Sequence, residues 1–217
     1  MCSLLFYMNQ SELIAEALRR IEVTFEKNLS ALNLNDLQLE EIPERLLQAQ
    51  HLKVLGLDNN RLKKLPEDFH RLRQLRVLDI SSNQLKGLPA SIGSFADLRV
   101  LNLKNNRIQS LPEEIGQLSS LMMLELRNNQ LKELPASISM LPKLRELYLK
   151  ANKLKSFPPG IENLSLLLKL DLSENKLKQA PENLSKLREL RMLWLKGNKF
   201  DTIPEELSSI CDLGNLS

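Results

Sequence analysis

The feature that most constrains this chain of 217 residues is an internal repeat of 23 residues. Copies of the type "LRVLNLKNNRIQSLP", which is residues 98–112, recur without insertion or deletion, giving eight full copies and a C-terminal stub. Their first leucines are Leu29, Leu52, Leu75, Leu98, Leu121, Leu144, Leu167, Leu190 and Leu213. A fixed period of this length predicts an array in which each copy packs on its neighbours and buries a continuous core.

Alternation within each copy predicts a short strand. In "VLNL" the leucines Leu101 and Leu103 flank Asn102, so they face one side of the strand and the asparagine faces the other. Stacked copies then pair their strands into a parallel sheet and place equivalent leucines in one column. That column is Leu55, Leu78, Leu101, Leu124, Leu147, Leu170 and Leu193.

Two further columns describe how the chain leaves each strand. An asparagine, whose amide can satisfy backbone donors and acceptors at the turn, occupies Asn60, Asn83, Asn106, Asn129, Asn152, Asn175 and Asn198, whereas the first copy has Leu37. Eight of the ten prolines form a second column: Pro43, Pro66, Pro89, Pro112, Pro135, Pro158, Pro181 and Pro204. Proline suits the start of a helical turn. The apolar pair that follows, such as Ile115 and Leu118, predicts a short helix or 3₁₀ turn packed back on the sheet.

The resulting pattern, L-x-x-L-x-L-x-x-N-x-L, resembles the leucine-rich repeat family over residues 29–217. The 23-residue form with Leu-Pro is similar to the cytoplasmic subclass found in Ras-associated and bacterial leucine-rich repeat proteins. The resemblance implies an α/β repeat solenoid, a curved horseshoe with a parallel sheet on its concave side. It also implies a protein-interaction module without catalytic activity, whose partners in the family include small GTPases, kinases and phosphatases.

The ends of the array predict a division into residues 1–28, a tail and capping helix, and residues 29–217, the repeats. Residues 11–27 have helical periodicity, with Ile14, Ala17, Leu18, Ile21 and Phe25 on one face, and Asn9 with Glu12 forms a capping pair. A helix that docks on a partner or a membrane is the alternative, although its polar face mixes both charges rather than being basic. At the other end, either the ninth copy covers the core or the chain continues in a longer protein.

A search for chemistry finds no catalytic or metal-binding constellation. His51 and His70, together with Cys2 and Cys211, have no zinc-ligand spacing, and no glycine-rich phosphate loop is present. We therefore expect no enzyme, no cofactor and no small-molecule substrate. A net charge of +3 does not favour nucleic-acid binding, and no apolar run is long enough for a membrane span. The two cysteines give no disulfide framework and fit a reducing cytoplasm.

What remains is the surface, above all the side chains that point into the concave face. Between the two leucines of each strand lie Asn33, Gly56, Asp79, Asn102, Glu125, Tyr148, Asp171 and Trp194. The next outward column is Asn35, Asp58, Ser81, Lys104, Arg127, Lys150, Ser173 and Lys196. Exposed aromatics ringed by charges are typical of binding hot spots. We therefore predict a partner-binding site of Glu125, Arg127, Tyr148, Lys150, Asp171, Trp194 and Lys196. Alternatively, the aromatics rest on their concave neighbours.

A second surface is electrostatic. Cations gather in the segment that leaves each strand: Arg61, Lys63, Lys86, Arg107, Lys132, Lys153, Lys155, Lys176, Lys178 and Lys199. Stacking turns these positions into a basic edge, which is either a solvated edge or a site for a polyanion or an acidic protein. Carboxylates follow the prolines at Glu67, Asp68, Glu113, Glu114, Glu182, Glu205 and Glu206, where helix N-termini favour them. A third possibility is that the chain is the recognition half of a larger signalling or effector protein.

Overall fold

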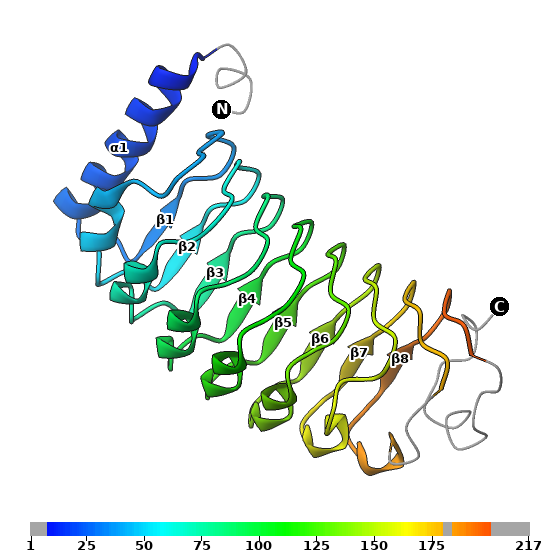
Figure 1. Cartoon of the computed structure of the whole chain (residues 1–217). Coiled ribbons are helices and arrows are strands. Elements are labelled where there is room, and N and C mark those ends of the chain that lie inside the picture. The colour runs from blue at the N-terminus through cyan, green and yellow to red at the C-terminus, as the bar shows by residue number, and fades with distance from the viewer. Residues whose placement is uncertain (1–7, 180–183, 201–217) are drawn as a thin grey trace.

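The computed structural model describes residues 8–179 and 184–200. The residues discussed above that lie outside these ranges are Cys2, Cys211, Pro181, Pro204, Glu182, Glu205, Glu206 and the stub that begins at Leu213. Within the described ranges the chain forms one N-terminal helix and a single sheet of eight parallel strands in sequence order. Figure 1 shows the strands side by side, the helical return turns along the lower-left edge of the stack and α1 at the N-terminal end.

Every described strand is three residues long; β1 is centred on Leu32 and the other seven are centred on the leucines of the predicted column. The strands are β1 (Ala31–Asn33), β2 (Val54–Gly56), β3 (Val77–Asp79), β4 (Val100–Asn102), β5 (Met123–Glu125), β6 (Glu146–Tyr148), β7 (Lys169–Asp171) and β8 (Met192–Trp194). The register advances by one repeat at each step, so that Leu101 lies opposite Leu124 and Leu124 opposite Leu147. The predicted parallel sheet is therefore confirmed, and its leucines are buried.

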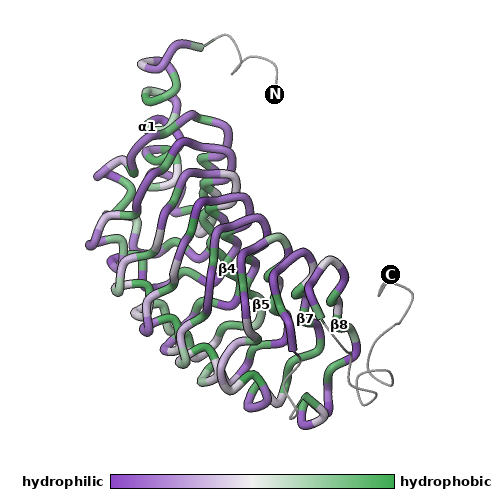
Figure 2. The backbone as a smooth tube through the Cα atoms, turned by 45° about the vertical axis from the view of Figure 1, so that its right-hand side comes forward, coloured by the Kyte–Doolittle hydropathy of each residue, from purple (hydrophilic) through white to green (hydrophobic). Residues whose placement is uncertain are grey.

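The return halves are 3₁₀ turns: η2 (Glu44–Gln48), η3 (Glu67–Arg71), η4 (Ala90–Ser94), η5 (Glu113–Gln117), η6 (Ala136–Met140), η7 (Ile161–Asn163) and η8 (Leu184–Lys186). In η2 to η6 the column proline immediately precedes the turn, and its carbonyl accepts the first turn bond, as in Ile115 N to Pro112 O at 3.1 Å. Ile115 and Leu118 are fully buried, as predicted. The bulkier returns give the stack a bend with the strands on its inner side (Figure 2).

The asparagine column ties neighbouring repeats together. Asn106 Nδ2 donates to the carbonyls of Ile80, one repeat earlier, and Leu103, in its own repeat, at 2.9 and 3.1 Å. Its Oδ1 accepts from the backbone N–H of Leu85 at 3.0 Å. The first copy lacks this amide, as predicted, and Leu37 is buried in the core in its place. The ladder thus begins at Asn60, whose Oδ1 accepts from Leu37 N at 3.2 Å.

The helix α1 (Gln10–Glu26) covers the first repeat and has the predicted cap. Asn9 Oδ1 accepts from Glu12 N at 3.1 Å, while Glu12 Oε2 accepts from Asn9 N at 2.7 Å. The predicted buried face was partly wrong. Leu13, Ala17, Ile21 and Thr24 are buried, whereas Ile14 and Leu18 are 42% and 40% exposed. The helix face that packs on the first repeat is therefore the one that contains Leu13, next to the predicted face that contains Ile14.

Candidate functional site

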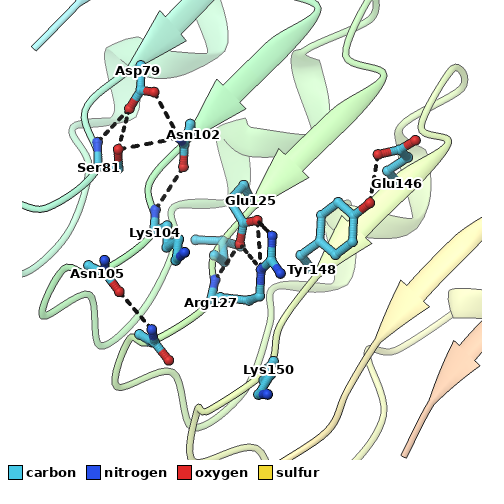
Figure 3. Close-up of polar contacts among 12 residues, drawn as sticks. Asp79, Ser81, Asn102, Lys104, Asn105, Glu125, Arg127, Glu146, Tyr148 and Lys150 are labelled. Carbon is cyan, nitrogen blue, oxygen red and sulfur yellow. Dashed lines mark hydrogen bonds and ion pairs between the residues drawn. The ribbon is translucent and has the colours of Figure 1, made fainter. Parts of the chain in front are cut away.

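The concave face begins with short polar side chains on β1 to β4. Asp79 Oδ1 accepts from Ser81 N at 2.9 Å and from Ser81 Oγ at 2.5 Å. Asn102 Nδ2 on β4 donates to Asp79 Oδ2 on β3 at 2.9 Å, so the hydrogen bonds connect the side chains of neighbouring strands (Figure 3). Because these groups satisfy one another, this half of the face is a hydrogen-bonded lattice of small side chains.

Gly56 is part of the same lattice. A Cβ at this position would lie 2.7 Å from Asn35 Oδ1, so a side chain would displace Asn35. Asn35 Oδ1 accepts from Asp58 N at 2.9 Å, a bond that crosses from one repeat to the next. The glycine at position 56 therefore leaves room for Asn35 to make this bond between the first two repeats.

On β5 the predicted surface residue Glu125 proves to be buried, with only 6% of its area exposed. Its carboxylate accepts from Arg127 Nε at 2.9 and 2.8 Å, from Arg127 N at 2.9 Å and from Arg127 Nη2. We expected an exposed carboxylate at this position, and that expectation was wrong because the long Arg127 side chain folds back over it. The hydrogen bonds to Glu125 raise the pKa of Arg127.

The Arg127 guanidinium reaches the next strand. Its Cζ lies 4.6 Å from the centroid of the Tyr148 ring, a cation–π contact across β5 and β6. Tyr148 is half-buried, and its hydroxyl donates to Glu146 Oε2 at 2.8 Å (Figure 3). Burial and this hydrogen bond raise the pKa of Tyr148, so the hydroxyl is a proton donor at neutral pH.

The network ends on β7. Glu146 Oε1 lies 2.9 Å from Lys169 Nζ. Burial opposes ionisation of Glu146, but the hydrogen bonds from Lys169 and Tyr148 outweigh it and hold the pKa of Glu146 below its ordinary value. We call the five connected residues Glu125, Arg127, Glu146, Tyr148 and Lys169 the concave network.

Sequence reasoning did not single out Glu146 and Lys169. They occupy the outward column that precedes the leucine of each strand, which reads Ala31, Val54, Val77, Val100, Met123, Glu146, Lys169 and Met192. The change from apolar residues to an opposite-charge pair in adjacent repeats is a signal that could have revealed them, since paired columns place the two side chains on neighbouring strands.

The other predicted site residues flank this network. Asp171 is 7% exposed, because Ser173 N and Oγ donate to its Oδ1 at 3.1 and 2.5 Å, so it too is less accessible than predicted. Lys150 Nζ lies 3.1 Å from Glu174 Oε1. Trp194 is half-buried on β8. In the register of the sheet, Asp171 lies between Tyr148 and Trp194. Lys196 is exposed.

The face thus joins aromatic surface with charges of both signs, which can orient a protein partner. Within residues 8–179 and 184–200, no three side chains of the metal-ligating types gather closely enough to hold a metal ion. No helix in the described part of the chain is long and apolar enough to cross a membrane.

Comparison with known proteins agrees with this architecture. A family model described as a leucine-rich repeat region matches residues 90–217, and another described as leucine rich repeat matches residues 27–85. No curated protein matches the chain in sequence.

Three solved structures illustrate the likeness. A leucine-rich repeat protein of Leptospira interrogans is 34% identical, with a TM-score of 0.84 over 90% of this chain and 51% of that one. The ectodomain of the Arabidopsis thaliana receptor kinase GASSHO1/SCHENGEN3, in complex with CASPARIAN STRIP INTEGRITY FACTOR 2, is also 34% identical, with a TM-score of 0.72 over 78% and 21%. YopM of Yersinia enterocolitica is 29% identical, with a TM-score of 0.69 over 88% and 39%. The chain therefore spans about half of the Leptospira protein and smaller shares of the other two.

Proposed function

This chain belongs to the leucine-rich repeat family, and from that premise we propose that it is a non-catalytic module that binds a protein partner on the concave face of its fifth to eighth repeats. The family mediates protein–protein interaction, and the GASSHO1/SCHENGEN3 ectodomain was solved in complex with CASPARIAN STRIP INTEGRITY FACTOR 2. The proposed location is the cytoplasm. Small GTPases, kinases and phosphatases remain the partner classes that the repeat subclass suggests.

The observation that carries this proposal is the concave network. Tyr148 is held by Arg127 on its ring and by Glu146 at its hydroxyl, so a partner that contacts it has little side-chain motion to arrest. Rigid aromatic surface gives contact area at a low cost in conformational entropy. Trp194, two strands away, provides a second aromatic anchor, and Lys150 and Lys196 supply charges that orient the partner.

Partner capture from lysate of the source organism tests the proposal when wild type is compared with Trp194→Ala. The partner should be retained by wild type and by Asn33→Ala on the first strand, and lost by Trp194→Ala. Equal retention by all three proteins would reject the concave site of the later repeats.

A second candidate function is binding of a polyanion or an acidic protein through the basic edge. In the structure all ten of its cations are exposed, and of these only Lys63 has an ion-pair partner among the described residues, Glu40 at 3.5 Å. Salt distinguishes the two functions. Affinity through the basic edge should fall steeply between about 50 and 200 mM salt, whereas affinity centred on Tyr148 and Trp194 should change little.

A third reading, the recognition half of a larger signalling or effector protein, agrees with the partial coverage of the longer relatives. It makes the concave face the targeting surface for an activity located elsewhere, and it predicts additional coding sequence beside that of this chain.

A further inference from the structure

We infer that the structure has a second binding site, unrelated to the concave face, in a groove between α1 and the connection that leads into η2. The geometry points to a peptide segment with apolar side chains flanked by lysine or arginine as its ligand. We call this site the cap groove. It is a cavity of about 740 Å³, lined on one side by Gln10, Ile14 and Leu18 of α1 and on the other by residues 39–45.

The apolar side chains of α1 that line the cap groove are not the ones that cover the core of the first repeat. The buried face of α1 already covers the first repeat with Leu13, Ala17 and Ile21. Ile14 and Leu18 stand one helical turn apart on the neighbouring face, at 42% and 40% exposure, opposite the half-buried Ile42. Large apolar side chains gathered around a cavity are characteristic of peptide-binding grooves.

The groove is held open because α1 is attached on both sides of it. At the start of the helix, Gln10 Nε2 donates to Gln38 O at 3.4 Å. Near its end, Arg45 donates to the two carboxylate oxygens of Glu22 at 2.7 and 3.0 Å, and its Cζ lies 4.4 Å from the centroid of Phe25. The apolar residues 14 and 18 lie between these attachments, so the cavity does not depend on a partner to form.

The shape favours a chain segment over a compact ligand. A second cavity of about 430 Å³ is lined by Glu41, Ile42, Lys64, Leu65, Pro66 and Glu67, and it shares Glu41 and Ile42 with the first. The apolar surface therefore continues from α1 across the returns of the first two repeats. Figure 1 shows the return of the first repeat next to α1 and that of the second repeat one step farther along the stack. An extended or helical peptide can follow this path and place one side chain in each cavity.

The charge of the rim selects a basic ligand. Four carboxylates, Glu40, Glu41, Glu44 and Glu67, line the two cavities, against Arg45 in the first and the exposed Lys64 in the second. Arg45 forms an ion pair with Glu22, and Lys63 Nζ lies 3.5 Å from Glu40 Oε2. Among the residues that the structure describes, no cation pairs with Glu41 or Glu44. Lysine or arginine beside an apolar anchor would complement these carboxylates.

Fluorescence anisotropy in about 150 mM salt tests the inference with a labelled ten-residue peptide of alternating leucine and lysine. Two matched peptides replace every leucine by serine or every lysine by glutamate. The leucine–lysine peptide should bind the full chain at least tenfold more tightly than either control. Leu18→Ser and the double variant Glu41→Lys/Glu44→Lys should each weaken that binding at least tenfold.

The chain offers a matched control for each variant. Glu133 occupies the position of Glu41 four repeats later and is exposed, as is Glu189, so Glu133→Lys/Glu189→Lys makes the same change of net charge as the groove double variant, away from the groove. Met140 is exposed on η6, so Met140→Ser removes exposed apolar surface of similar size. Both control variants should bind the peptide like wild type, and all four proteins should melt within a few degrees of one another.

Three results would overturn the inference. The first is equal affinity for the three peptides, or binding that the groove variants leave unchanged. The second is a dimer in sedimentation experiments that Leu18→Ser dissociates, which would make a second copy of the chain the occupant. The third is peptide binding that appears only after residues 1–7 are removed, which would make the chain's own start the occupant. Failure of this test would leave the concave site untouched, since none of these residues lies on the concave face.

Discussion

Between the two leucines of each strand, β1 to β4 carry glycine or short polar side chains, whereas β5, β6 and β8 carry Glu125 with Arg127 folded over it, Tyr148 and Trp194. Of the later strands, β7 alone keeps the short pattern, with Asp171 bonded to Ser173. Asp79 and Asn102 exemplify the first group, and Arg127 and Tyr148 the second (Figure 3). Both halves have the same strand length, the same register and the same leucine column beneath them. The solenoid thus lets the concave surface vary along its length while the core remains constant.

The largest expected effect tests the shared core. Leu78→Ala in β3 and Leu124→Ala in β5 should each lower the free energy of unfolding by about 2–5 kcal/mol, because both side chains are fully buried in one column. Urea denaturation of the two variants measures this. A loss in one half that is several times the loss in the other would break the comparison, because the halves would then differ in their cores as well.

A smaller effect should separate the two surfaces. Arg127→Ala removes the partner of the buried Glu125 carboxylate and the contact with Tyr148, so it should cost about 1–3 kcal/mol in unfolding free energy. Asn102→Ala in the first half removes neutral hydrogen bonds to Asp79 and Ser81 and should cost about 0.5–1.5 kcal/mol. The same denaturation assay compares them, and an Arg127 variant as stable as wild type would show that the concave network contributes nothing to folding.

The smallest effect concerns pH. The folded-state pKa of Glu146 is lowered, so the stability it contributes is fully present above the unfolded-state pKa and is lost as the pH falls through the folded-state value. Wild type should therefore lose stability below about pH 4.5, and Glu146→Gln should flatten part of that loss, by less than about 1 kcal/mol for a pair that remains partly solvated.

Melting temperatures of wild type and Glu146→Gln between pH 7 and pH 3 check this expectation. Glu133→Gln, an exposed carboxylate in the fifth repeat, is the control and should follow wild type throughout. A Glu146 variant that follows wild type just as closely would mean that the ion pair with Lys169 does not form in solution.

The sequence predicted the strands, the leucine column, the asparagine ladder and the proline-led turns, because a fixed period places every residue of a copy in a known column. The loss of the ladder's first member at Leu37 was also predictable, since that column position is visible in the sequence. In each case the property depends on the position within the repeat and not on which side chains surround it.

What could not be predicted depends on neighbouring side chains. The burial of Glu125 follows from the way Arg127 folds over it and extends to Tyr148, and a column assignment says only that position 125 faces outward. The buried face of α1 was missed for a related reason. The helix carries apolar residues on two adjoining faces, at Leu13 and at Ile14 with Leu18, so periodicity alone does not decide which face packs on the first repeat.

The central claim is that the two halves differ in binding, and the affinity of a purified partner for concave variants tests it most directly. Tyr148→Ala and Trp194→Ala should each weaken the complex by roughly 2 kcal/mol or more if they are hot spots. Asn33→Ala and Asp58→Ala, on the first two repeats, should change the affinity by less than about 0.5 kcal/mol. Isothermal titration calorimetry, with thermal melts to establish that each variant is folded, provides the measurement. A partner that binds both aromatic variants as tightly as wild type would contradict the account and move the search to the basic edge.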